Sequence, residues 1–260
     1  MDIRLDGRSA IITGGSKGLG LAIAKEMASS GADVAVLARD PASLAEAKAD
    51  IQKVAKAKVA AISCDVSKAA PIKAAYDQVM KEFGKVDILV NNAGQSQAGP
   101  ILDVTDEMWQ ADFDLKVFAA LRLVRLCMPQ MKDRKWGRII NVLNIGAKAP
   151  GPRSVPTSVS RAAGLAITKV LAHEGAPHNV LANALHVGVI VSDQIVRRHK
   201  REGTNVSLED FIKKAGEPVP LGRMGKAEEF AAVATFLASE QAGYVTGTSI
   251  NVDGGRSPIW

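Results

Sequence analysis

Short apolar runs alternate with longer amphipathic stretches along the whole chain. Between the runs, stretches such as Leu19–Ser30 and Ala42–Lys56 place apolar residues at helical spacing. Strands that alternate with helices of this length form βαβ units, because each crossover packs a helix on a face of the sheet. The pattern therefore predicts an α/β fold with a parallel sheet. Its strands are expected at Ser9–Thr13, Asp33–Ala38, Val59–Ser63, Val86–Val90, Arg138–Leu143, Val180–Leu185 and Ser249–Val252.

The chain shows no internal repeat, low-complexity tract or linker. Its 260 residues suit one α/β domain, so we expect a single domain over residues 1–260. One long irregular region, Val187–Pro220, is charged and broken by glycines. A long insertion of this kind often closes an active site. We therefore expect a lid at about residues 190–220, with a mobile segment over Ser192–Gly216.

Composition narrows the class of protein. Apolar residues make up 47% of the chain and aromatic residues only 4%, which fits a core of Ala, Val, Ile and Leu. The cysteines, Cys64 and Cys127, both lie in apolar patterns, so no disulfide framework is expected. The chain has no signal-peptide pattern and no apolar run near the roughly 20 residues that span a bilayer. These features predict a cytoplasmic protein that does not bind membranes.

The net charge of +6 indicates the kind of partner. The basic residues are scattered and aromatic residues are few, which argues against nucleic-acid binding and favours an anionic small-molecule substrate. The densest basic run, Arg197–Arg201, lies in the expected lid. This run either attracts a carboxylate or a phosphorylated acyl carrier, or forms a solvated helix face.

The stretch TGGSKGLG lies between the first expected strand and the first expected helix. Gly14 permits a tight turn, Gly18 lets the backbone approach a phosphate, and Gly20 lets helix and strand pack closely. The helix start behind the loop offers unpaired N–H groups to a pyrophosphate. The loop therefore predicts a dinucleotide site, with contacts from Gly14, Ser16, Lys17, Gly18, Leu19 and Gly20.

The end of the second expected strand indicates which dinucleotide binds. A carboxylate there would accept from the ribose 2′-hydroxyl of NAD(H). This chain instead has Ala38 followed by Arg39, and Lys17 supplies a second cation. Two cations and no acid favour a 2′-phosphate, so the sequence predicts NADP(H) rather than NAD(H).

Five motifs occur in a fixed order: TGGSKGLG, CDV at 64–66, NNAG at 91–94, PLGRMG at 220–225 and NVDGG at 251–255. With these motifs the chain resembles the short-chain dehydrogenase/reductase family over nearly its whole length. The resemblance implies a single-domain, doubly wound (Rossmann) sheet of seven parallel strands with helices on both faces. It also implies redox chemistry on a carbonyl/alcohol pair.

The resemblance assigns further cofactor contacts. Asp65 would bond the adenine amine, and Val66 would pack on the adenine ring. Gly188 would stand below the nicotinamide, although Val187 replaces the proline that usually precedes it. The adenine-ribose side of the cleft would be lined by Asn92, Ala93 and Gly94.

The family's catalytic residues are replaced in this chain. Family members use a tyrosine as acid/base, a lysine that lowers its pKa and holds the ribose, a serine that orients the carbonyl, and an asparagine that holds a water. In the same order, these positions carry Thr157, Arg161, Asn144 and Lys116. The hydroxyl of Thr157 cannot ionise near neutral pH, so Thr157 is not expected to replace a phenol as proton donor. Arg161 keeps its charge for ribose hydroxyls, and Asn144 can still donate to a carbonyl.

The proton donor is therefore open. His186 at the end of the sixth expected strand titrates in the right range, but it fits equally well as an ordinary histidine bonded to backbone. Lys116 with a lowered pKa is another candidate, since Arg161 would favour its neutral form. Alternatively, Asp112 and Asp114 neutralise both cations in a purely structural network.

These residues predict an NADP(H)-dependent oxidoreductase acting on a carbonyl/alcohol pair of an anionic substrate such as an oxoacyl compound. The alternatives are a catalytically silent NADP(H)-binding subunit or sensor, and a non-redox isomerase or lyase. The expected helices Asp106–Lys132 and Pro156–Glu174 carry more apolar residues than one sheet-facing stripe uses. Family members pair these helices across a two-fold axis, which implies a homotetramer or homodimer.

Overall fold

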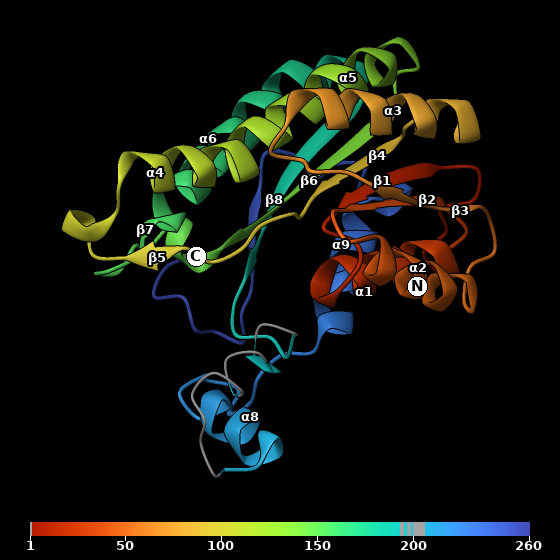
Figure 1. Ribbon diagram of the computed structural model, residues 1–260. Coiled ribbons are helices and arrows are strands. Elements are labelled where there is room, and N and C mark those ends of the chain that lie inside the picture. The colour runs from red at the N-terminus through yellow and green to blue at the C-terminus, as the bar shows by residue number, and fades with distance from the viewer. Residues whose placement is uncertain (1, 193–194, 197–198, 200–205) are drawn as a thin grey trace.

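A seven-stranded parallel sheet forms the centre of the computed structural model, which describes residues 2–192, 195–196, 199 and 206–260 (Figure 1). The strand order is β3-β2-β1-β4-β6-β8-β9. The order reverses between β1 and β4, and ligands of open α/β sheets bind at the carboxyl ends of the strands beside such a reversal. The strands are β1 (Ser9–Thr13), β2 (Asp33–Ala38), β3 (Val59–Ser63), β4 (Ile88–Asn91), β6 (Gly137–Asn144), β8 (Val180–Val187) and β9 (Ser249–Val252).

Helices cover both faces of this sheet (Figure 1). One face carries α1 (Gly18–Ser29), α2 (Pro41–Gln52) and α9 (Ala227–Leu237). The other carries α3 (Ala69–Phe83), α5 (Ala119–Asp133) and α6 (Thr157–Gly175). The doubly wound fold predicted from the sequence is therefore confirmed. No helix among the described residues is long and apolar enough to cross a bilayer.

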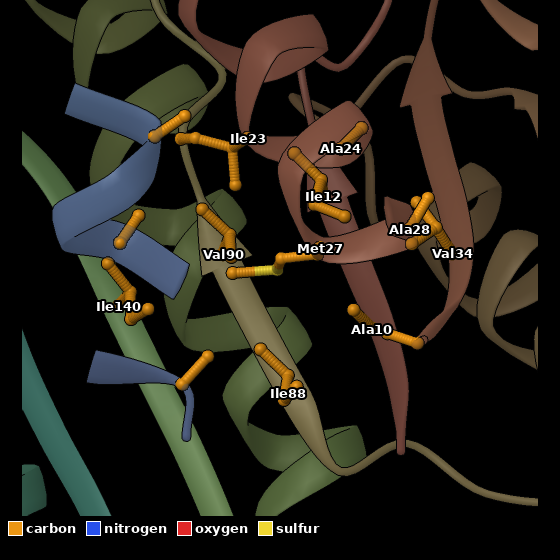
Figure 2. Packing of buried hydrophobic residues seen from close by; sticks show 14 of the residues in the cluster. Ala10, Ile12, Ile23, Ala24, Met27, Ala28, Val34, Ile88, Val90 and Ile140 are labelled. Carbon is orange, nitrogen blue, oxygen red and sulfur yellow. The ribbon is translucent and has the colours of Figure 1, made fainter. Parts of the chain in front are cut away.

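The two hydrophobic clusters explain why apolar residues stand at successive positions of the strands. Ile12, Val90 and Ile140 pack on the α1 side, where Met27 of α1 extends toward Val90 (Figure 2). Their neighbours Ile11 and Leu89 pack on the opposite face, with α3 and α5. Because both faces are buried, successive side chains pointing to opposite sides are all apolar.

Two regions differ from the sequence expectation. The helix expected over Asp106–Lys132 is divided into α4 (Asp106–Phe113), a π-helical turn η2 (Asp114–Phe118) and α5. The expected irregular region contains the helix α8 (Leu208–Gly216), which projects from the body of the molecule (Figure 1). A π turn leaves no clear mark in apolar periodicity, and the amphipathic α8 was obscured by the surrounding charges.

Short elements complete the chain. β5 (Ala98–Gly99) pairs antiparallel with β7 (Val155–Pro156), directly before α6. This small sheet covers the start of α6, where the catalytic tyrosine was expected. The 3₁₀ turns are η1 (Ile101–Asp103), η3 (Ile145–Ala147), η4 (Ala176–His178) and η5 (Glu240–Ala242).

Candidate active site and nucleotide cleft

The glycine loop has the geometry expected of a phosphate-binding turn. Gly14 and Gly18 adopt positive φ angles of 64° and 54°. A Cβ on Gly20 would lie 2.2 Å from the Gly14 carbonyl oxygen, so only glycine allows this helix to approach the strand. Lys17, the N-cap of α1, makes no side-chain capping bond. The N–H groups at the start of α1 therefore receive no side-chain cap from Lys17.

Thr13 and Asn92 hold this loop in place. The Thr13 hydroxyl accepts from the backbone N–H groups of Asn92 and Ala93, each at 2.9 Å. The Asn92 amide donates to the carbonyls of Thr13 at 2.8 Å and Gly14 at 3.2 Å. The side chain of Asn92, expected to line the cofactor, thus braces the glycine loop.

The residues expected to distinguish the two dinucleotides lie at the end of β2. Arg39 and Lys17 are exposed there. The nearby carboxylate of Asp40 caps α2 by accepting from the backbone N–H of Ser43 at 3.0 Å. Its hydrogen bonds to Ser43 lower the pKa of Asp40, and the charge of Lys17 contributes less. The one acid of this turn is therefore used in a helix cap.

Three other expected cofactor residues have structural partners as well. The carboxylate of Asp65 accepts from the backbone N–H of Ser67 at 3.0 Å, and Val66 is buried in the cluster under α3. A Cβ on Gly188 would lie 2.5 Å from the Cα of Asp253, so the close approach of this backbone segment requires glycine at position 188. Contact of these residues with a cofactor stays a prediction.

A buried network occupies the position of the family's catalytic residues. Lys116 in the π turn forms an ion pair with Asp112, and both side chains are 1% exposed. The Lys116 ammonium also donates to the Thr157 hydroxyl at 2.9 Å. The other carboxylate oxygen of Asp112 accepts from the Ser160 hydroxyl at 2.5 Å. Four side chains from α4, η2 and α6 thus satisfy one another.

Only one of the two candidate neutralising acids takes part. Asp112 pairs with Lys116 as that alternative expected, whereas Asp114 pairs with Arg122 at 3.2 Å. The prediction for Asp114 is therefore wrong. Asp112 and Asp114 are two residues apart, so they point to different sides of the helix. No role was assigned to Ser160 from the sequence, although it lies one helical turn after Thr157 and could have been placed on the same face.

Thr157 is covered as well as bonded. Its hydroxyl accepts from the backbone N–H of Gln97 at 3.0 Å and donates to the Gln97 carbonyl at a longer 3.3 Å. Gln97 directly precedes β5, and Thr157 is 6% exposed. The short side chain at this position is therefore enclosed by the small β5–β7 sheet.

Arg161 lies beside this network, half-buried on α6. It donates to the Val142 carbonyl at 2.6 Å, and a Cβ on Gly94 would lie 2.4 Å from its Nη2 atom. Burial lowers the pKa of Arg161 to about 10, and the charge of Asp112 opposes this shift. Arg161 thus stays charged at neutral pH. Burial also lowers the pKa of Lys116; the bond to Asp112 opposes that shift and the charge of Arg161 adds to it.

His186 is part of the sheet. Its side chain is 0% exposed, Nδ1 lies 2.8 Å from the Asn144 carbonyl, and Nε2 lies 2.7 Å from the Ser249 hydroxyl. Burial lowers the pKa of His186. Both ring nitrogens are engaged, which is the arrangement of the ordinary strand-end histidine rather than of a proton donor. The side-chain oxygen of Asn144 is buried and has no partner within the described residues.

Sequence reasoning missed Lys148. Its ammonium donates to the Ser249 carbonyl at 3.1 Å and to the Asn251 side chain at 3.0 Å, close to His186. No motif marks this lysine. Of the basic run in the expected lid, Arg197, Arg198, Lys200 and Arg201 lie outside the described residues. His199 lies 2.8 Å from the Val206 carbonyl and packs edge-on against Phe211.

Comparison with known proteins identifies the family. Residues 14–257 match the family model described as "Enoyl-(Acyl carrier protein) reductase". The chain belongs to the short-chain dehydrogenase/reductase family. It is 32% identical to a 3-oxoacyl-(acyl-carrier-protein) reductase of Staphylococcus epidermidis, over 95% of this chain and 98% of that one. It is 36% identical to the D-beta-hydroxybutyrate dehydrogenase of Cupriavidus necator, over 96% and 98%.

Two solved structures have nearly the same fold as this chain. L-sorbose reductase from Gluconobacter frateurii, complexed with NADPH and L-sorbose, has a TM-score of 0.95 at 33% identity, over 100% of both chains. An NADPH-bound short-chain oxidoreductase from Pseudomonas aeruginosa PAO1, described as containing an atypical catalytic centre, has a TM-score of 0.90 at 34% identity, over 99% of both chains. The same fold thus also accommodates a catalytic centre that is described as atypical.

The buried ion pair yields a prediction about stability. Replacing Asp112 by Asn leaves the Lys116 charge buried without its counter-ion, which should lower the free energy of unfolding by about 3–5 kcal/mol near pH 7. The pKa of Lys116 then falls further below the ordinary 10.5. The unfolded chain then binds more protons than the folded one, so the loss should shrink as the pH rises toward 10.5. Denaturant unfolding at several pH values measures this.

The matched control is Asp114→Asn. Its pair with Arg122 is partly exposed, so this variant should lose about 1 kcal/mol or less, without the same rise toward alkaline pH. Equal losses in both variants would contradict the assignment of the buried charge to Asp112.

Proposed function

We propose that this chain is an NADP(H)-dependent oxidoreductase that acts on a carbonyl/alcohol pair of an anionic substrate such as an oxoacyl compound. In its active site, Thr157 at the tyrosine position and Lys116 at the asparagine position would together take over the proton transfer that the family assigns to its tyrosine and lysine. The observation that carries this proposal is the 2.9 Å bond from the Lys116 ammonium to the Thr157 hydroxyl. It couples a cation of lowered pKa to a hydroxyl at the tyrosine position.

The glycine loop fits the proposed cofactor. Among the described residues, a Cβ on Gly18 would meet only the Ser192 side chain, at 3.8 Å, so this part of the structure leaves the backbone open to a phosphate. Exposed Lys17 and Arg39 would hold a 2′-phosphate, and Arg161 would hold ribose hydroxyls. The similar NADPH-bound structures support this choice. When bound, NADPH supplies the hydride that reduces the carbonyl carbon.

The proton would come from the buried network. The Thr157 hydroxyl accepts two hydrogen bonds, and its own proton makes only the 3.3 Å contact with Gln97. The Thr157 hydroxyl alone is too weak an acid, so it would act as a relay: in the proposed step it gives its proton to the substrate oxygen and in the same step takes one from Lys116. Lys116 becomes neutral, a form that burial and the charge of Arg161 both favour. Oxidation of the alcohol would reverse these transfers.

Asn144 and His186 take different parts in this proposal. Asn144 would donate its amide to the substrate carbonyl. His186 bonds the backbone of Asn144, so it fixes that residue and donates no proton to substrate. The cations Arg161 and Lys148 favour an anionic substrate, and the relative that reduces 3-oxoacyl groups supports an oxoacyl compound.

A silent NADP(H)-binding subunit is the second candidate. It is favoured by the bond between Thr157 and Gln97 and by the ion pair of Lys116 with Asp112, because side chains that are bonded to one another need no substrate. Mixing the protein with NADPH and a broad set of ketones and oxoacyl thioesters separates the candidates. Oxidation of NADPH in a single turnover supports the enzyme, and its absence at every pH supports the silent subunit.

The cofactor preference is testable by calorimetry. NADPH should bind about tenfold more tightly than NADH or better, because Lys17 and Arg39 make charged hydrogen bonds only with the 2′-phosphate. The preference should disappear in Arg39→Asp. It should persist in the control Arg4→Asp, an equal charge change just before β1, at the amino ends of the strands. Equal affinities in the native protein would refute this cofactor assignment.

The proton route is testable by paired variants. Thr157→Val should lower kcat by about 10²–10⁴-fold, whereas Thr157→Ser should keep most of it. Lys116→Arg retains the charge but cannot release a proton at these pH values, so it should also lower kcat. Carbonyl reduction needs Lys116 protonated, so in the native protein it should decline as the pH passes a value below 10.5. Full activity of Thr157→Val would exclude this route.

We also propose that α6 contacts a second copy of the chain. Val159, Ala162, Ala166 and Val170 are exposed and lie three to four residues apart, so they form one apolar stripe. Light scattering should find a dimer or tetramer at micromolar concentration. Val170→Glu should dissociate it and Lys169→Glu should not, although both residues are exposed on α6. A monomeric native protein would contradict the proposal.

A further inference from the structure

A small cavity lies between the sheet and α6, beside the proposed active site. Its volume is about 20 Å³, and one water needs about 10–15 Å³. Asn91, Lys116 and Arg161 contribute polar side chains to its wall. Asn91 Oδ1 and Arg161 Nε are buried, and neither has a hydrogen-bond partner in the described part of the chain. One atom is an acceptor and the other a donor, and the two residues that carry them line the same cavity.

The acceptor is directed into the cavity by a chain of hydrogen bonds that starts on α6. Thr168 donates its hydroxyl proton to the Gly164 carbonyl at 2.8 Å, so its oxygen accepts from the Asn141 amide at 2.8 Å. The oxygen of Asn141 then accepts from the amide of Asn91, also at 2.8 Å. Each hydrogen bond fixes the orientation of the next side chain. The side-chain oxygen of Asn91, at the end of the series, has no partner among the described residues. The chain therefore requires a donor in the cavity.

We propose that one trapped water connects the two unpartnered atoms, accepting from Arg161 Nε–H and donating to Asn91 Oδ1. Lys116 uses two of its three protons on Asp112 and Thr157 and can supply the third to this water. Three partners are typical for a buried water. Asn91 is thus a positioning residue for Arg161.

The bridge explains why arginine suits this position. The guanidinium is held by the Val142 carbonyl at one terminal nitrogen and by Gly94 against the other. These two contacts at the terminal nitrogens still allow the guanidinium plane to turn. A third contact, at Nε, fixes that plane. A lysine has no donor at this point of its side chain. The value of this position for cofactor binding rests on the proposed function.

The first test needs no cofactor. The ¹⁵N-correlated NMR signal of the Arg161 Nε–H, assigned by its loss in Arg161→Lys, should exchange slowly and show contact with water in the free protein. In Asn91→Ala the exchange should be about tenfold faster, because the bridging partner is gone. Unchanged exchange would overturn the proposal, and so would a crystal structure with an empty cavity.

The control is Asn183→Ala. Asn183 is a buried amide on β8, which β6 separates from the β4 strand of Asn91, and it bonds the backbone of Val245 and Thr248. Its replacement should also lower stability but leave the Arg161 signal unchanged. A signal that responds equally to both variants would reduce Asn91 to general structural support and overturn the positioning role.

The second test measures NADPH affinity in a double-mutant cycle. Asn91→Ala should weaken binding about three- to tenfold in the native background, and not further in the Arg161→Lys background. Equal losses in both backgrounds would contradict positioning through Arg161. If NADPH does not bind at all while the exchange result holds, the proposed function fails and the water bridge stands.

Discussion

The arrangement of this site depends on one ion pair held out of water. An ammonium as deeply buried as that of Lys116 loses several kcal/mol of hydration, which a single carboxylate offsets only with further hydrogen bonds. Asp112 is therefore bonded by Ser160, and Thr157 accepts from Lys116. The π turn and the start of α6 are therefore joined by hydrogen bonds to the two members of this ion pair.

The fold could be predicted from the sequence because its signals are local and repeated. Strands such as β1 and β2 are buried on both faces, so an apolar run marks each of them from end to end. The glycine loop could also be recognised from the sequence, since the close contact with Gly14 allows only glycine at position 20. The break at η2 was not predicted, because one wider turn hardly changes the helical repeat of apolar residues.

The position of the candidate site could be predicted from the sequence, but the pairing of its side chains could not. The replaced residues Lys116, Thr157 and Arg161 do lie together, as the resemblance implied. Asp112 at the end of α4 and Asp114 at the start of η2 project from different sides of the helix, and the sequence alone left the two acids as equivalent partners of the lysine. His186 shows the same limit, because its partners Asn144 and Ser249 come from two other strands.

The bond between Thr157 and Gln97 has a consequence for any attempt to rebuild the family's usual centre. The Thr157 hydroxyl is bonded to Gln97 and to Lys116, so a tyrosine at this position would remove both bonds. A lysine at position 161 would place a second flexible ammonium beside Lys116. Each single replacement is thus unfavourable while the other residues are kept. The usual residues would have to be introduced together.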